Sequence, residues 1–148
     1  MIAVLQRVSR ASVTVDSEVC GKINEGLLIL LGVKDGDTER DAILLADKIS
    51  KLRIFSDENG KMNLSVKDIS GSVLVISNFT LMANYKKGNR PDYMSGAKPQ
   101  EANRLYTYFC DYISTIVPTE RGIFGADMKV DLLNDGPVTI VMDSEVLK

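Results

Sequence analysis

The stretch LNDGPVT, residues 133–139, decides how the C-terminal part of this 148-residue chain folds. It lies between two runs rich in β-branched and aliphatic residues, 125–133 and 138–143, which we interpret as strands. Asn-Asp-Gly is typical of a tight turn, so we expect the chain to reverse here and the two strands to form a hairpin. Pro137 is unusual in that place, because proline donates no backbone hydrogen bond and marks a strand edge, a bulge or a special bend. On these residues alone, a plain surface turn is the simplest interpretation.

The composition is that of a globular protein without a strong overall charge. Hydrophobic residues make up 45% of the sequence, charged residues make up 26%, and the net charge is −2. A nucleic acid would therefore have to bind to a local basic patch. We predict a single domain over residues 1–148, because a chain of this length needs only one core. The longest apolar run, 27–31, is too short to cross a bilayer, and the N-terminal residues do not form a signal peptide, which indicates a cytoplasmic protein that does not contact membranes.

Histidine is absent from the sequence, which removes the commonest general base and the Ser-His and Cys-His nucleophile pairs. The two cysteines, Cys20 and Cys110, have no metal-ligand spacing, so we predict no metal site and no cofactor. If the protein is an enzyme, its chemistry must come from backbone groups, hydroxyls, carboxylates, lysines or the substrate itself.

The other sequence patterns predict a sheet covered by helices. Helical periodicity predicts one helix from Thr38 to about Leu52, opened by a capping box, and a second that begins at Pro99. Strands outnumber helices and are mostly joined by hairpins, so we expect an α+β fold: a curled, barrel-like mixed or antiparallel sheet covered by two main helices. Open edges of such a sheet favour a homodimer. The runs 2–8 and 11–15 predict a bent strand with 18–23 as its hairpin partner, and further apolar or alternating runs predict strands at 27–33, 53–55, 62–64 and 72–77.

The segment NYKKGNRPDYMSGAKP, residues 84–99, is the one local basic patch. Lys86, Lys87 and Arg90 lie close together in it, with two interleaved tyrosines and a single acidic residue. Cations neutralise phosphates and tyrosines stack on unpaired bases, so the end of a single-stranded RNA is a candidate partner. A solvated loop without a partner explains the same residues.

Two motifs, SNFTL at residues 77–81 and NDGPVT at residues 134–139, give the chain a resemblance to the D-aminoacyl-tRNA deacylases, also called the D-tyrosyl-tRNA deacylase family, which are homodimeric editing enzymes of translation. The family's first motif usually reads Ser-Gln-x-Thr-Leu, whereas here Asn78, one methylene shorter, stands in the second position. The second motif matches without change. The resemblance covers essentially the whole chain and includes QRV at 6–8, ASV at 11–13, LLGV at 30–33, LRIF at 52–55, GKMNL at 60–64 and FGADM at 124–128.

The resemblance implies a hydrolase that cleaves the ester of D-aminoacyl-tRNAs, and of mischarged glycyl-tRNA, and that spares L-aminoacyl-tRNA. It also implies that the Gly136–Pro137 peptide bond is cis and that this dipeptide enters the active site of the partner subunit, where its carbonyls form a wall against L side chains. Arg7 would steady the bend by hydrogen bonding. Phe124 and Met128 would line the pocket.

Hydrolysis of an aminoacyl ester needs a positioned water and donors for the developing oxyanion. We predict that the backbone N–H groups of Phe79 and Thr80 are these donors, beside Ser77 and Asn78, and that the 2′-hydroxyl of the tRNA helps to activate the water. A Thr80 nucleophile is the second possibility, although no base stands near it in the sequence. Lys86, Lys87 and Arg90 are the predicted tRNA-binding residues.

Two functions of other classes also fit the sequence. The first is an RNA-binding module without catalysis that uses the segment 84–99. It predicts salt-sensitive binding of tRNA without loss of the aminoacyl group. The second is a homodimeric hydrolase or racemase that acts on free D-amino acids or their small esters, which predicts turnover of D-aminoacyl ethyl esters without any ribose.

Overall fold

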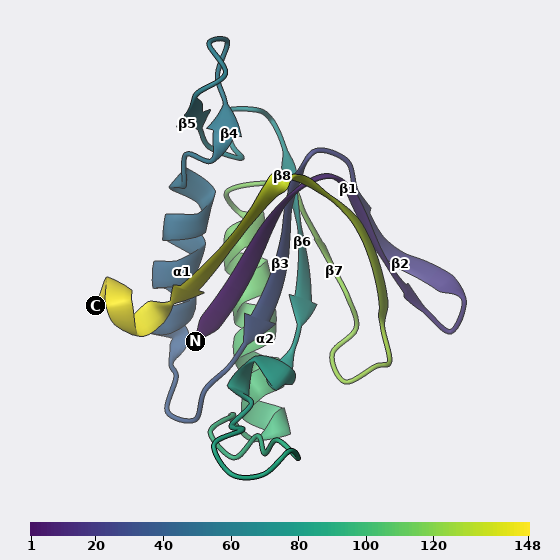
Figure 1. Cartoon of the computed structure of the whole chain (residues 1–148), viewed down its shortest axis with the longest axis vertical. Helices are drawn as coiled ribbons and strands as arrows, with labels where there is room; N and C mark the ends of the chain where they lie inside the picture. The colour runs from purple at the N-terminus through teal and green to yellow at the C-terminus, as the bar shows by residue number, and fades with distance from the viewer.

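The computed structural model describes all residues from 1 to 148 and confirms the predicted α+β architecture, with two main helices and a curled mixed sheet (Figure 1). No helix in it has the length and apolar character that a membrane span requires. The elements, with two 3-10 helices labelled η, are in chain order β1 (Ile2–Val15), β2 (Glu18–Ile23), β3 (Gly26–Gly32), α1 (Glu39–Lys51), β4 (Phe55–Ser56), β5 (Met62–Leu64), β6 (Ser72–Ser77), η1 (Phe79–Met82), α2 (Pro99–Ser114), β7 (Thr119–Arg121), β8 (Lys129–Asp143) and η2 (Ser144–Leu147).

The main sheet has the strand order β2-β1-β3-β6-β7, and β8 pairs with β1. Strand β1 is antiparallel to β2, β3 and β8, whereas β3, β6 and β7 are parallel to one another. The prediction that hairpins join most strands is wrong, because hairpins join only β1 to β2 and β4 to β5. The parallel pairs need long crossovers, and the segments that contain α1 and α2 supply them.

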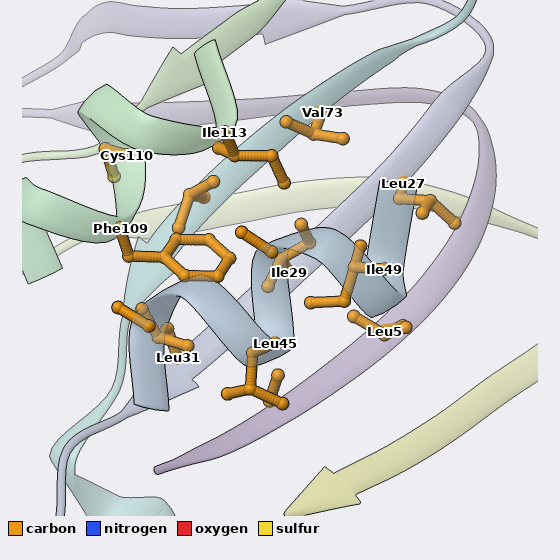
Figure 2. Packing of buried hydrophobic residues seen from close by; sticks show 14 of the residues in the cluster. Leu5, Leu27, Ile29, Leu31, Leu45, Ile49, Val73, Phe109, Cys110 and Ile113 are labelled. Atoms are coloured by element: carbon orange, nitrogen blue, oxygen red, sulfur yellow. The ribbon is translucent and has the colours of Figure 1, made fainter. Parts of the chain in front are cut away.

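Strand β3 is apolar throughout because both of its faces are covered. Leu27, Ile29 and Leu31 belong to the large cluster beneath the two helices, where Leu45 of α1 and Phe109 of α2 pack against them (Figure 2). The alternate positions of the sheet form a second cluster that fills the inside of its curl, with Val8, Ala11, Val13, Ile23, Leu28, Leu74 and Ile76.

The sheet nearly closes into a barrel where β2 approaches β6 and β7. A Cβ atom on Gly21 of β2 would lie only 3.0 Å from the carbonyl oxygen of Arg121 and 3.0 Å from Cδ1 of Leu74. Both contacts are tighter than nine in ten real Cβ contacts, so a larger residue would require the carbonyl of Arg121 and the side chain of Leu74 to shift by a few tenths of an ångström.

The predicted hairpin at residues 133–139 is wrong. Strand β8 continues through this stretch in one direction and pairs with β1 from Lys129 opposite Thr14 to Asp143 opposite Ile2. Thr139 pairs with Gln6 and Asn134 pairs with Val8, so residues 135–138 have only Arg7 opposite them. The turn residues therefore form a bulge inside one long strand: Pro137 cannot donate to the ladder, and Gly136 has a φ of 135° that other residues avoid.

Other segment boundaries also differ from the prediction. The predicted strand at 53–55 is reduced to Phe55–Ser56, whereas the runs 2–8 and 11–15 form one strand, as predicted. Residues 125–128 are a loop rather than the beginning of the last strand, and β7 was not predicted because three residues carry little periodicity. The strand 72–77 has the predicted bounds. The first predicted helix agrees with α1 to within about one residue at each end, and α2 begins at Pro99, as predicted.

Asp41 in the first turn of α1 ties this helix to the C-terminal residues. Its side chain is buried and accepts hydrogen bonds from the Ser144 hydroxyl at 2.7 Å and from the Thr38 backbone N–H at 2.9 Å, and Nζ of Lys148 lies 3.0 Å away. Burial alone would raise the pKa of Asp41, but the hydrogen bonds from Ser144, Thr38 and Lys148 outweigh it and lower the pKa well below its ordinary value.

The replacement Asp41→Asn should lower the free energy of unfolding by about 2 kcal/mol at pH 7, because a charged acceptor with several donors is lost. Since the pKa is lowered in the folded state, the stabilisation is complete above the pKa of the unfolded chain, near pH 4, and is lost as the pH falls below it. Urea titrations should show that the difference in free energy of unfolding between wild type and variant becomes smaller from pH 7 to pH 2.5. Asp35→Asn, an exposed site with the same charge change, is the control. A difference in free energy of unfolding that stays constant with pH would contradict the lowered pKa of Asp41.

Candidate active site

A cavity of about 810 Å³ opens at the carboxyl ends of the parallel strands β3 and β6. This is the end of a parallel sheet at which α/β proteins bind ligands. Most of its wall is apolar and comes from α2, the sheet and the loop before β8. The apolar residues include Leu30, Ile76, Ala97, Ala102, Phe124 and Met128, and the polar ones are Ser77, Asn78, Thr80, Tyr93, Tyr106 and Asp127.

The motif 77–81 bends the chain at the mouth of this cavity. The backbone N–H of Asn78 still donates to the carbonyl of Leu31 at 2.8 Å, so β6 stays paired up to that residue. The 3-10 helix η1 then begins at Phe79 and lies against Gly32. A Cβ atom on Gly32 would lie 3.2 Å from the carbonyl oxygen of Asn78 and 3.1 Å from Cβ of Leu81, so the glycine lets the bend lie close to β3.

Asn78 caps this short helix with its side chain. Its Oδ1 accepts a hydrogen bond from the Thr80 backbone N–H at 3.3 Å and from the Thr80 hydroxyl at 2.5 Å. Its backbone carbonyl accepts from the N–H of Leu81 at 3.3 Å. The first N–H of a helix has no partner within the helix, and the Phe79 N–H has none elsewhere. Of the two predicted donors, Phe79 is therefore free and Thr80 is already hydrogen bonded.

The side chains around the cavity offer little acid–base chemistry. Burial, followed by the neighbouring Cys110, raises the pKa of Tyr106, so its hydroxyl stays protonated, and it donates to the carbonyl of Val75 at 2.9 Å. The one carboxylate in the wall, Asp127, is exposed and pairs with Lys129 at 3.2 Å. The free groups next to the bend are the Phe79 N–H and the hydroxyl of Ser77, for which the structure records no hydrogen bond.

A cationic loop lies next to the rim of the cavity. Phe79, which is 65% exposed, and Tyr93 meet edge to face with ring centroids 5.0 Å apart. Between them in sequence, Lys86, Lys87 and Arg90 are exposed and form no ion pair. The loop is held in place by backbone pairing of Asn84 with Asp92 and by the Ser95 hydroxyl, which donates to the carbonyl of Met82.

The bulge at Gly136 is braced by Arg7. The Arg7 side chain donates from Nε to the carbonyl of Asp135 at 3.0 Å and from Nη1 to the carbonyl of Ile54 at 2.8 Å. Across the bulge, the Asn134 side chain accepts from the Val138 N–H at 3.1 Å and donates to the Thr139 hydroxyl at 3.0 Å. The Gly136–Pro137 peptide bond is cis, as the resemblance implies, and both residues are exposed.

The bulge and the cavity lie far apart in one copy of the chain. Arg7, opposite the bulge, pairs with Leu27 of β3, whereas Ser77 pairs with Leu31. The two sites are therefore separated by roughly 13 Å along the strands and by roughly 14 Å across β1 and β3. No residue from 134 to 137 lines the cavity.

The structure thus gathers Ser77, Asn78, Phe79, Thr80 and the loop residues Phe124 and Met128 around one cavity, and places the other predicted site residues elsewhere. Arg7, Gly136 and Pro137 form a separate group, and the basic residues flank the rim. Sequence reasoning did not find the walls supplied by Leu30, Ala97, Ala102 and Tyr106. Leu30, Ala102 and Tyr106 have the spacing of ordinary strand and helix core residues, and Ala97 lies in the loop before α2, so their positions in the sequence carry no separate signal.

One cluster of carboxylates has the spacing of a metal site but is paired with two cations of the chain. Oxygen atoms of Asp37, Asp41 and Glu145 lie within 4.8 Å of one another. The amino group of Met1 lies 2.7 Å from Asp37, and Lys148 contacts both Asp41 and Glu145. The cluster is therefore an ion-pair network that joins α1 to the chain ends.

Residues 4–143 match the family model described as "D-Tyr-tRNA(Tyr) deacylase". The chain is similar to the D-aminoacyl-tRNA deacylase of Vibrio cholerae serotype O1, with 60% identity over 139 residues that cover 94% of this chain and 96% of that protein. It is also similar to the D-aminoacyl-tRNA deacylase of Geobacter metallireducens, with 56% identity over 145 residues that cover 97% of this chain and 96% of the relative.

Two solved structures have a similar fold. A structure named "c-Myc DNA Unwinding Element Binding Protein" superposes with a TM-score of 0.92 and 39% identity, covering 97% of this chain and 98% of the other. A second structure, described as a "probable eukaryotic D-amino acid tRNA deacylase", superposes with a TM-score of 0.82 over 96% of this chain and 98% of the other. At 15% identity, this second likeness shows a shared fold alone.

Proposed function

The chain belongs to the D-Tyr-tRNA(Tyr) deacylase family, and from this premise we propose that it is an editing hydrolase that cleaves D-aminoacyl-tRNA to the free amino acid and tRNA. The observation that carries the proposal is the cavity at the end of β6, where an unpaired backbone donor stands at the mouth of an apolar pocket. An aminoacyl ester is already activated, so a donor for the oxyanion and an oriented water can suffice for its hydrolysis.

The Phe79 N–H is the group that we assign to the oxyanion, since it is the free donor of the bend. The 2′-hydroxyl of the terminal ribose helps to orient the attacking water, which agrees with a chain that has no histidine. Thr80 suits the role of nucleophile less well. Its hydroxyl donates to Asn78, and among the residues that line the cavity there is no lysine to deprotonate it.

The choice between mirror-image substrates requires a second copy of the chain. L- and D-aminoacyl groups differ only in where the side chain points, so a rigid wall at the L position rejects every L residue alike. We assign this wall to the carbonyls of Gly136 and Pro137, which are exposed and far from the cavity of their own chain. In a homodimer the bulge of one subunit would complete the cavity of the other. Glycine has no side chain to reject, so glycyl-tRNA would also be cleaved.

The tRNA itself would be held by the cationic loop. Lys86, Lys87 and Arg90 carry unpaired charges beside the rim formed by Phe79 and Tyr93. Cations at this place neutralise phosphates near the 3′ end, and the exposed ring of Phe79 and the half-buried ring of Tyr93 offer surfaces for its bases. A substrate of this kind places the enzyme in the cytoplasm, where tRNAs are charged.

The decisive assay uses one tRNA charged with D-tyrosine, L-tyrosine or glycine and follows the release of each amino acid. D-tyrosine and glycine should be released and L-tyrosine should be retained, because only an L side chain meets the wall. D-tyrosine ethyl ester should turn over far more slowly, since it lacks the ribose hydroxyl.

Two results would favour the other functions. Salt-sensitive binding of all three tRNAs without any release would indicate a nucleic-acid-binding module. Cleavage of the ethyl ester as fast as the D-tyrosyl-tRNA would indicate a hydrolase of small D-amino acid esters.

The role of the Phe79 N–H can be isolated with the pair Phe79→Pro and Phe79→Ala. Both remove the ring, but only proline removes the N–H, and proline is well tolerated at the first position of a helix. The proline variant should hydrolyse D-tyrosyl-tRNA about 100- to 1,000-fold more slowly at saturation than the alanine variant. Equal rates in two folded variants would show that this N–H does not serve the oxyanion.

The shared site can be tested with Gly136→Ala. A Cβ on Gly136 would lie 2.8 Å from Cγ2 of Val138 and 3.1 Å from Nη2 of Arg7, so the bulge must shift and the variant should lose selectivity. Gly60→Ala, at a remote glycine with a φ of 75° and open space around it, is the matched control and should keep the selectivity.

A heterodimer of one Gly136→Ala subunit and one Phe79→Pro subunit, purified through two tags, tests whether the bulge serves the partner's cavity. One of its two sites would then combine an intact Phe79 with an intact Gly136, so the heterodimer should be D-selective at about half the wild-type rate. Selectivity as poor as that of Gly136→Ala alone would show that each bulge serves its own subunit.

A further inference from the structure

We propose that the Asn78 side chain is a positioning residue for the ester hydrolysis, which acts by holding Thr80 and so fixes the backbone at Phe79, and that it does not itself bind the substrate. This inference rests on the proposed function and deepens it, because it says what keeps the oxyanion donor in place. It follows from how the hydrogen bonds of residues 78–81 are distributed.

Asn78 anchors the bend on both of its sides. Its N–H is fixed to the carbonyl of Leu31 on β3, and its backbone carbonyl receives the N–H of Leu81. Its Oδ1 receives both the N–H and the hydroxyl of Thr80. One residue thus links the rigid end of the sheet to three groups of η1, with Phe79 between the fixed points.

The cap also decides which donor is free. A short helix begins with N–H groups that have no partner inside it. With Asn78 in place, the N–H groups of Thr80 and Leu81 are taken and that of Phe79 is left. Without the cap, the N–H and hydroxyl of Thr80 would be released and the bend would lose its link to the side chain of Asn78. An oxyanion donor works because it is fixed before the reaction, so the expected loss is in the chemical step rather than in binding.

The side-chain oxygen of Asn78 is the group that this role requires. Asparagine and serine are strong helix N-caps because a short side chain can accept from an N–H two or three residues ahead, whereas alanine offers no acceptor. If the amide instead contacted the substrate directly, through its Nδ2, which has no partner in the chain, serine would be as poor a substitute as alanine.

Asn78→Ser and Asn78→Ala separate these two roles in single-turnover hydrolysis of D-tyrosyl-tRNA over a range of enzyme concentrations. We expect the serine variant to keep the maximal rate within about threefold, and the alanine variant to lose about 10- to 100-fold. The enzyme concentration at half-maximal rate should change by less than about threefold in both. A serine variant as slow as the alanine variant would overturn the proposal in favour of direct contact, and two unchanged rates would overturn it altogether.

Two controls distinguish a loss of positioning at Phe79 from a general loss of stability. Asp57→Ala removes a similar cap at the β4–β5 turn, where Asp57 Oδ1 accepts from the N–H groups of Asn59 and Lys61, and should leave the hydrolysis rate unchanged. Combining Asn78→Ala with Thr80→Val should cost less than the sum of the two single effects, because both break the same hydrogen bond. Fully additive effects would contradict an action through Thr80.

A wild-type protein that does not hydrolyse D-tyrosyl-tRNA would instead refute the proposed function, and this inference with it.

Discussion

The pairing of β1 with β8 along their whole length is the constraint on which the rest of the molecule depends. Both halves of β8 must stay in register with the same strand, although residues 135–138 have only Arg7 to pair with. The surplus backbone can only leave the plane of the sheet, and Arg7 holds it there through the carbonyl of Asp135. Because the same guanidinium also binds the carbonyl of Ile54, the bulge is fixed to the segment that follows α1.

The other end of the sheet is organised by a different means. The parallel strands β3 and β6 end together, and the chain turns into η1 at the point where their ladder stops. Glycine at position 32 leaves room for the bend, and the apolar wall from α2 and the loop 123–128 shields it. A backbone N–H beside an apolar wall interacts more strongly with a developing charge than it would in water, because the local dielectric constant is lower.

Much of this arrangement could be predicted from the sequence. The periodicity of 72–77 and of the two helices, and the proline at the beginning of α2, indicated their elements closely, because each of these segments is long or carries a strong boundary residue. The segment 133–139 misled the prediction, since Asn-Asp-Gly occurs equally in a hairpin and in a bulge and only the partner strand distinguishes them. The contact of Asn78 with Thr80 was also beyond reach, because a polar side chain at the end of a strand does not reveal which neighbour it will bond. The walls from Ala97, Ala102 and Tyr106 depend on how α2 packs, which the sequence pattern does not specify.

In the proposed site, the donor at Phe79 and the carbonyls at Gly136 and Pro137 are all main-chain atoms. Every amino acid except proline carries the same N–H, and every amino acid carries the same carbonyl, so the chemistry is encoded in the path of the chain and not in reactive side chains. The residues that matter are then those that shape the path, namely glycine, proline and a capping asparagine. A covalent inhibitor that reacts with an activated serine, cysteine or lysine would find no such nucleophile in this pocket. Inhibition would require a molecule that resembles the bound ester in shape.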